Sequence, residues 1–178
     1  MTNKPFTPEC LEQIPLFGAL SKSECTQLME ISTSRTFQPG ENVLEQGRQS
    51  QELWVLLEGK CEVFKSPEGG RPGFTLATLE PFSSFGEMSF FHSAPHSASV
   101  RAATRVKLLC IRRERFDELT SREPAVAYKL AVNTVGSLAE RMRRMDQWVG
   151  ELLSKGIADQ RPSEWSQLRD KLFESWTL

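Results

Sequence analysis

The sequence is poor in residues that hold metals. It has only two histidines, His92 and His96, and its cysteines show no CxxC spacing. Metal sites usually need several His, Cys or carboxylate ligands at spacings such as HxH or HExxH, and neither motif occurs here. We therefore expect no metal cofactor and no disulfide framework. In a chain of this size, such scattered cysteines are typical of reduced thiols in a cytoplasmic protein. They are Cys10, Cys25, Cys61 and Cys110.

The sequence also lacks an excess of basic charge and long apolar runs. Lys plus Arg number 22 against 23 for Asp plus Glu, which gives a net charge of -1. A nucleic-acid binder that relied on overall basicity would carry a clear positive excess. Apolar runs such as Leu53–Leu57 are far too short to span a bilayer. We therefore expect neither DNA nor a membrane among the partners.

What is present indicates a folded core. The 178 residues suffice for one ordinary domain with a small appendage, and 39% of them are hydrophobic. Residues 1–31 form a helical lead-in. Ser21 followed by Glu24 has the spacing of a capping box, which predicts a short helix over Lys22–Ile31.

Residues 32–111 show short apolar and β-branched runs, separated by Gly and Pro every eight to twelve residues or so. Many short strands at this spacing favour an antiparallel sandwich or barrel. The predicted strands are Arg35–Phe37, Val43–Leu44, Leu53–Leu57, Cys61–Phe64, Phe74–Leu79, Ser99–Ala102 and Val106–Ile111.

Residues 112–178 are predicted to be helical. A short helix over Arg112–Ser121 is followed by Pro124, a favourable first residue for a long helix. Apolar residues then recur at alternating steps of three and four between 128 and 152, which is a heptad seam that suits a parallel homodimer. Alternatively, this helix packs on its own barrel. The seam consists of Tyr128, Ala131, Val135, Leu138, Met142, Met145, Val149 and Leu152.

The last segment also has a helical pattern. Residues 163–176 place Trp165, Leu168, Leu172 and Trp176 on one face. This face is either a docked tail or a surface for a partner protein over residues 163–178.

The stretch from Phe85 to Val100 carries the chemistry. Gly86 allows a ligand to approach the backbone closely, and Glu87 can accept hydrogen bonds from a ribose hydroxyl. Met88–Phe91 can form one helical turn whose unbonded N–H groups point at an anion. Ser97 and Ser99 add donors from the returning strand. The stretch therefore predicts a pocket for an anion joined to a sugar.

These residues resemble the cyclic nucleotide-binding domain family. Phe85-Gly86-Glu87 and the stretch 95–100 match the two ends of that family's phosphate-binding cassette, and the length between them fits without a gap. Fragments that agree elsewhere are Ile14-Pro-Leu-Phe17, Phe37-Gln-Pro-Gly-Glu41, Gln46-Gly47, Leu56-Leu-Glu-Gly59 and Arg115-Phe116. The resemblance covers roughly Ile14 to Met145.

The resemblance implies a mainly β fold with flanking helices. This fold is an eight-stranded jelly roll with a long C-terminal helix that dimerises, as in catabolite activator proteins. The implied parts are a jelly-roll domain over 1–123, a dimerisation helix over 124–155 and a short amphipathic tail over 156–178. The implied ligand is cAMP or cGMP. The implied binding residues are Phe85, Gly86, Glu87, Met88, Ser89, His96, Ser97, Ala98 and Ser99.

Two positions depart from the family pattern. His96 stands where the family usually has an arginine, so the fixed charge that meets the phosphate is missing. We expect His96 either to meet the anion in a partly protonated form or to be a surface imidazole on a pocket that no longer binds cyclic nucleotides. Phe82 stands where a glycine is common, so we expect a reshaped turn before the cassette.

The sequence leaves three candidate functions. The first is a stand-alone, non-enzymatic sensor that binds a cyclic nucleotide, weakly because of His96, and signals through its dimer helix. The second is a degenerate domain that acts as a dimeric scaffold. The third, a cupin-type enzyme, needs more histidine ligands than the chain has. Roughly 25 residues follow Leu153, too few for a winged helix-turn-helix, so a DNA-binding regulator is disfavoured.

Overall fold

The computed structural model describes residue 11, residues 14–66 and residues 72–154. The chain divides into two compact units, Met1–Thr134 and Val135–Leu178. The tail expected over 156–178, with its partner surface at 163–178, lies outside the described residues, as does residue 155 at the expected end of the long helix.

The N-terminal helices form as their sequence predicts. A single 3-10 turn, η1 (Pro15–Phe17), precedes α2 (Lys22–Glu30). The Ser21 hydroxyl accepts a hydrogen bond from the Glu24 N–H at 3.3 Å, and the Glu24 carboxylate accepts one from the Ser21 N–H at 2.6 Å. This reciprocal pair confirms the predicted capping box.

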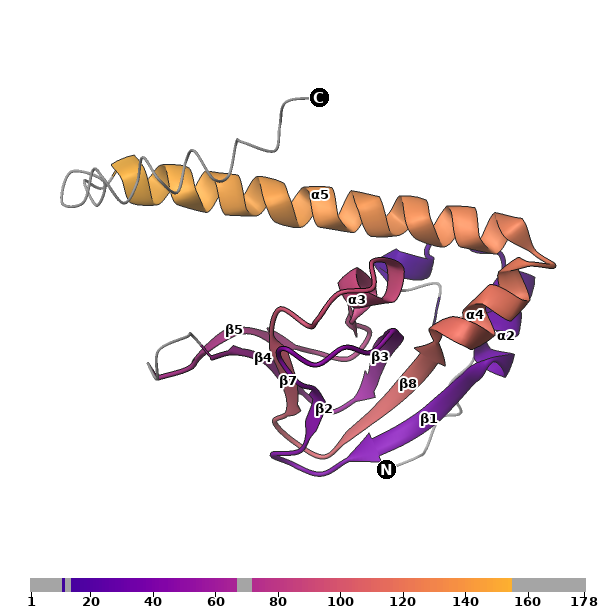
Figure 1. The fold of residues 1–178 in the computed structure, drawn as a ribbon, viewed down its shortest axis with the longest axis horizontal. Helices are drawn as coiled ribbons and strands as arrows, with labels where there is room; N and C mark the ends of the chain where they lie inside the picture. Colours follow the sequence, from indigo (N-terminus) through magenta and orange to yellow (C-terminus); the bar gives the residue numbers. More distant parts are fainter. Residues whose placement is uncertain (1–10, 12–13, 67–71, 155–178) are drawn as a thin grey trace. The chain divides into compact units, whose positions relative to one another are not determined.

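Eight strands form two antiparallel sheets (Figure 1). The first sheet has the order β1 (Ser32–Phe37), β8 (Val106–Arg112), β3 (Glu52–Glu58) and β6 (Ser84–Phe85). The second has the order β2 (Asn42–Leu44), β7 (Ser99–Ala102), β4 (Cys61–Lys65) and β5 (Phe74–Leu79). The jelly-roll fold class is confirmed, and each predicted strand is present. β6 is the strand that the sequence pattern missed.

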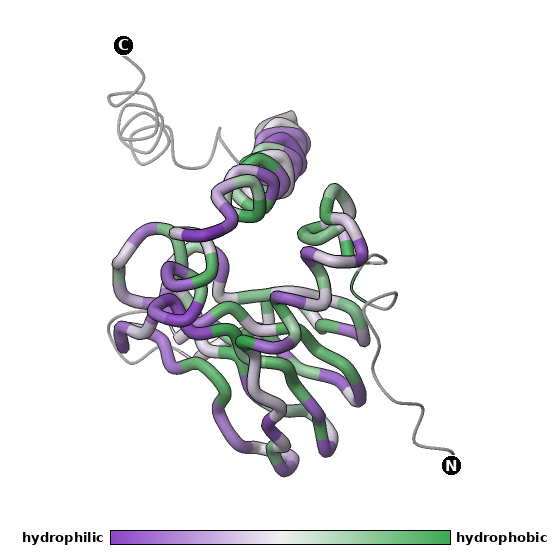
Figure 2. The backbone as a smooth tube through the Cα atoms, turned by 90° about the vertical axis from the view of Figure 1, so that its right-hand side faces the viewer, coloured by the Kyte–Doolittle hydropathy of each residue, from purple (hydrophilic) through white to green (hydrophobic). Residues whose placement is uncertain are grey.

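Strands β8 and β3 of the first sheet are buried on both faces, whereas the edge strand β1 is largely exposed. One face packs on the second sheet through a cluster that includes Trp54, Leu108 and Cys110. The other face packs on the helices through Leu53, Ile111 and their neighbours. Figure 2 shows hydrophobic stretches along the strands and hydrophilic segments at many of the turns that connect them. The alternation of side chains along β3 and β8 thus supplies residues to two cores.

Three further helices complete the described chain, namely α3 (Glu87–Phe91), α4 (Arg113–Thr120) and α5 (Pro124–Ser154). The start of α5 belongs to the first unit, where Val126 and Leu130 are fully buried. Lys129 Nζ donates to the Glu24 carboxylate at 2.7 Å. Burial raises the pKa of Glu24, but its hydrogen bonds with Lys129 and Ser21 outweigh burial and hold that pKa below its usual value.

Cys25, Cys61 and Cys110 are buried and free of disulfide bonds. Burial raises the pKa of Cys61 to about 11, so its thiol stays protonated and unreactive at neutral pH. Within residues 14–66 and 72–154, no helix has the length and apolar character needed to cross a bilayer.

Candidate functional site

The cassette begins at a glycine that no other residue replaces easily. Gly86 has a φ of +86°, and a Cβ atom at this position would lie 2.5 Å from the carbonyl oxygen of Glu52 on β3. The left-handed backbone and the close approach both favour glycine. Gly86 is therefore the single residue that turns the chain from β6 into α3.

α3 is a short helix that presents the start of its backbone beside Gly86. The first i to i−4 bond within it runs from the Phe90 N–H to the Gly86 carbonyl at 3.0 Å. The N–H groups of the preceding turn have no acceptor within the helix. Glu87, the first residue of α3, is only 6% exposed. A buried carboxylate and a helix start thus adjoin the same turn.

The structure brings together some of the predicted site residues and leaves others exposed. Met88 and Ser97 are exposed, whereas Gly86, Ala98 and Ser99 are half-buried. The buried members of the predicted set are Phe85, Glu87, Ser89 and His96. Ser89 and His96, seven positions apart, meet through a hydrogen bond of 2.9 Å.

His96 is buried between two serine hydroxyls. Its Nδ1 lies 2.9 Å from Ser89 Oγ, and its Nε2 lies 2.9 Å from Ser50 Oγ. Ser89 Oγ donates its proton to the Gly86 carbonyl at 3.2 Å, so we assign the imidazole proton to Nδ1 and the acceptor role to Nε2. The bonds therefore suit a neutral ring.

The interpretation of His96 as a surface imidazole is wrong, because the side chain is only 7% exposed. Burial lowers the pKa of His96 below its usual value, since an imidazolium loses its hydration there, although the nearby Glu52 carboxylate opposes this shift. Sequence reasoning missed this outcome because it depends on Ser50, which lies 46 positions earlier.

The segment Glu45–Gln51, which we call the strap, is hydrogen bonded to the cassette. The Gly47 N–H donates to the His96 carbonyl at 2.9 Å, and the His96 N–H donates to the Arg48 carbonyl at 2.8 Å. Gln51 Nε2 donates to the Phe90 carbonyl at 3.1 Å. The strap thus binds both the helix and the return of the cassette. The polar run from Gln46 to Gln51 is the sequence signal that could have indicated it.

Ser99 and Phe82 flank the cassette. Ser99 Oγ accepts a hydrogen bond from the Gln46 N–H at 3.0 Å. Since its neighbour Val100 is buried between the sheets, Ser99 points to the opposite face of β7. Phe82 has a φ of +70°, and its N–H donates to the Leu56 carbonyl at 2.7 Å. The turn before the cassette therefore keeps a left-handed residue without glycine, at a cost in strain.

An aromatic cluster joins the cassette to α4. The ring of Phe116 on α4 lies 5.2 Å from that of Phe90 and 6.3 Å from that of Phe91, both edge-to-face. Arg113 Nη1 also donates to the Phe90 carbonyl at 2.9 Å. Because α4 leads directly into α5, a displacement of α3 has a packed route to the start of the long helix.

Comparisons with known proteins agree with this geometry. The family model described as "Cyclic nucleotide-binding domain" matches residues 34–123. The cyclic AMP receptor protein of Thermus thermophilus is 35% identical over 74% of this chain and 59% of its own length. A cAMP-dependent protein kinase regulatory subunit of Mycosarcoma maydis is 28% identical over 71% of this chain and 25% of its own length.

A solved structure is similar to this chain as well. The crystal structure of the Thermus thermophilus catabolite activator protein superposes with a TM-score of 0.68 and 34% identity, and the match covers 79% of this chain and 63% of that one. The chain thus spans less than two thirds of each of these relatives.

Replacing Gly86 by Ala should destabilise the protein more than the same change at Gly40. Both residues have a positive φ, but a Cβ at Gly40 meets nothing within 4 Å. We expect Gly40→Ala to cost about 1–2 kcal/mol for the left-handed backbone. Gly86→Ala should cost about 1–3 kcal/mol more through the clash with Glu52. Urea unfolding checks both values, and equal losses would contradict the close approach.

The free energy of unfolding should fall as the pH drops below about 6.5, because the unfolded chain then protonates His96 and the folded chain does not. The loss is at most about 1.4 kcal/mol per pH unit, down to the folded pKa. Urea unfolding of the wild type and of His96→Gln between pH 5 and 8 measures it. A stability difference between the two proteins that stays constant with pH would show that His96 titrates normally.

Proposed function

Since the chain belongs to the cyclic nucleotide-binding domain family, we propose that it is a non-enzymatic regulatory sensor that binds cAMP or cGMP in its cassette. The observation that carries the proposal is the turn at Gly86, where a left-handed glycine, a buried carboxylate and the start of a helix lie in succession. Such a turn can bind a ribose hydroxyl and a phosphate side by side.

Each part of the cassette has a proposed role. Glu87 accepts a hydrogen bond from the ribose 2′-hydroxyl, and the first N–H groups of α3 meet the phosphate. Ser97, exposed at the return of the cassette, adds a hydroxyl donor. The proposed binding residues are those of the predicted set: Phe85, Gly86, Glu87, Met88, Ser89, His96, Ser97, Ala98 and Ser99.

Binding should be weak at the phosphate end. An arginine would bring a fixed charge to the phosphate, whereas His96 is buried and its pKa is lowered. Loss of one charge-assisted contact costs about 1.5–3 kcal/mol, or about 10- to 150-fold in affinity. The cassette retains its sugar contact and loses most of its electrostatic attraction for the ligand.

The signal is proposed to leave the cassette through α4. Ligand contacts at the start of α3 would favour one packing of Phe90 and Phe91 against Phe116, and so one position of the start of α5. The response is thus a shift between two arrangements of packed aromatic rings. The buried thiols of Cys61 and Cys110 are typical of a reducing compartment, so we place this sensor in the cytoplasm.

α5 is proposed to join two copies of the chain through residues 128–152. Four residues of the predicted heptad seam expose large apolar side chains to solvent in the single chain. A partner helix packed along the seam would cover them. Their exposed fractions are 72% for Tyr128, 66% for Val135, 47% for Met142 and 50% for Met145.

A second candidate function is a scaffold that binds no cyclic nucleotide. The observation that favours it is the occupation of both ring nitrogens of His96 by Ser50 and Ser89. A histidine held in this way must give up a hydrogen bond before it can donate to a phosphate. In this case the dimer helix and the tail with its partner surface over residues 163–178 carry the function.

Calorimetry with cAMP and cGMP at neutral pH separates the two candidates. The sensor should bind at least one of them weakly, and Glu87→Gln should lower its affinity about tenfold or more, since a carboxylate acceptor is lost. Glu80→Gln is the control, because Glu80 pairs with Lys60 on the surface. His96→Arg should raise the affinity by about tenfold or more.

If neither the wild type nor His96→Arg binds either nucleotide at millimolar concentration, the sensor proposal is wrong and the scaffold remains. If Glu80→Gln weakens binding as much as Glu87→Gln, the ribose contact at Glu87 is wrong.

The full chain should be a dimer in solution. The double variant Val135→Glu, Met142→Glu should be a monomer. Each chain of the dimer would carry two added carboxylates, so four buried negative charges would face one another across the seam. Ser137→Glu is the matched control, because Ser137 is an exposed c position on the outer face of the same heptad. Sedimentation equilibrium measures the mass. A monomeric wild type at micromolar concentration, or dissociation by Ser137→Glu alone, would contradict the seam.

A further inference from the structure

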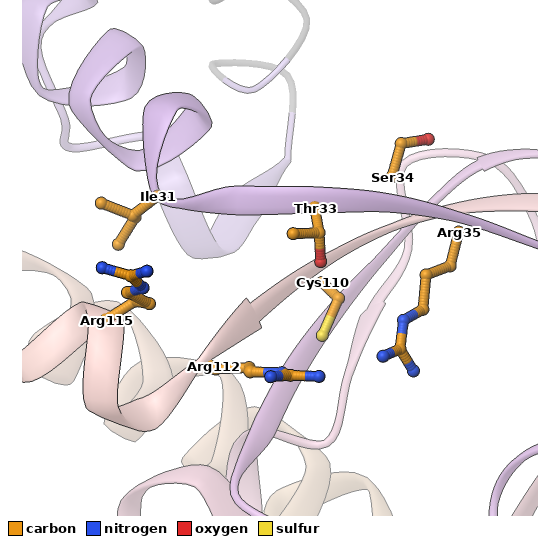
Figure 3. A pocket seen from close by; sticks show the side chains of 7 residues that line it. All are labelled: Ile31, Thr33, Ser34, Arg35, Cys110, Arg112 and Arg115. Atoms are coloured by element: carbon orange, nitrogen blue, oxygen red, sulfur yellow. The ribbon is translucent and has the colours of Figure 1, made fainter.

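A cavity lies away from the cassette, where β1 and β8 meet the start of α4. Its volume is about 280 Å³. Figure 3 shows the residues that line it, and none of them belongs to the cassette or to the strap. They are Ile31, Thr33, Ser34, Arg35, Cys110, Arg112 and Arg115.

Sheet register places two of the arginines on one face. Thr33 pairs with Cys110 and Arg35 pairs with Leu108, so these side chains share the face of Arg112. Figure 3 shows the guanidinium groups of Arg35, Arg112 and Arg115 on the same side of β1 as the Cys110 sulfur, while Ser34 points to the other side. Three positive groups therefore surround one small cavity.

The position of these charges does not favour the stability of α4. Arg112 is the N-cap of α4, and Arg115 is its third residue. A helix start carries a partial positive charge, so cations there are unfavourable and anions are favourable. No side chain caps this helix start, and Glu114 is the one acidic residue in its first turn. An anion in the cavity would offset both the arginines and the helix dipole.

The guanidinium groups are available to a ligand. Arg112 pairs with Glu52 at a long 3.7 Å, and Arg115 pairs with Glu118 at 3.2 Å between two side chains that are more than half exposed. The exposed pair of Arg115 with Glu118 contributes little to stability, and the 3.7 Å between Arg112 and Glu52 is too long for a hydrogen bond. Arg35 lies 5.8 Å from the centre of the Trp54 ring, and no carboxylate of the described residues forms an ion pair with it.

We propose that this cavity binds the phosphate group of a small phosphate monoester. Guanidinium groups present paired donors that match phosphate oxygens, and three of them suit a dianion. The Thr33 hydroxyl adds a further donor, and Figure 3 shows it beside the Cys110 sulfur. At about 280 Å³, the cavity lies at the small end of ligand sites, which fits a short phosphorylated metabolite.

Calorimetry of the full chain with glycerol 3-phosphate and inorganic phosphate, at constant ionic strength, tests the proposal. We expect saturable one-to-one binding of both probes. Arg35→Gln and Arg115→Gln should each weaken it about tenfold or more, because each removes charge-assisted hydrogen bonds. Arg112→Gln should act in the same direction. Circular dichroism and urea unfolding establish that each variant is folded.

Arg101→Gln is the matched control. Arg101 also pairs with a carboxylate, Glu62, at 3.3 Å and lies 5.4 Å from an aromatic ring, that of Phe64, but it lines a different cavity, which lies between the strap, β4 and β7. It should leave the affinity unchanged. The proposal is overturned if neither probe binds saturably at millimolar concentration, or if Arg101→Gln weakens binding as much as Arg35→Gln. It is also overturned if His96→Gln abolishes binding while the three arginine variants do not, because the phosphate then binds in the cassette.

Discussion

The arrangement of the cassette depends on one buried imidazole. His96 is hydrogen bonded at both ring nitrogens, to Ser50 of the strap and to Ser89 of α3, and its backbone pairs with Gly47 and Arg48. The strap, the cassette helix and the return to β7 are therefore joined at a single residue. A neutral imidazole can make these bonds at little desolvation cost, whereas a buried charge without a counter-ion would be costly.

Because His96 is neutral, the cassette lacks the positive charge that an arginine at this position would bring. In the proposed function the cassette meets an anion through backbone N–H groups and hydroxyls, while Arg35 on β1 and two arginines at the start of α4, Arg112 and Arg115, line a separate cavity. The net charge of -1 conceals this uneven distribution. Arg113 lies between Arg112 and Arg115 in the sequence and bonds to the Phe90 carbonyl. The head of α4 is thus adjacent both to the cassette and to the arginine cavity.

Much of the fold was predictable because its signals are local. The capping box at Ser21 and Glu24 formed as its spacing predicted, and strands β5 and β7 have the predicted bounds. β6 was missed because it has only two residues and exists through its pairing with β3. In the cassette, the helical turn after Gly86 was predictable, whereas the burial of His96 was not. The dimer and the tail remain predictions.

Local patterns in the chain were enough to predict the kind of most elements, the family of the domain and the glycine turn that opens the cassette. These features depend on the spacing of neighbours along the chain and on turn residues such as Gly86. The surroundings of His96 and the grouping of the arginines around one cavity depend instead on how distant segments pack. Ser50 lies 46 positions before His96, and Arg35 meets β8 through sheet register. Such contacts arise when distant segments pack together, and no short-range pattern in the sequence specifies them.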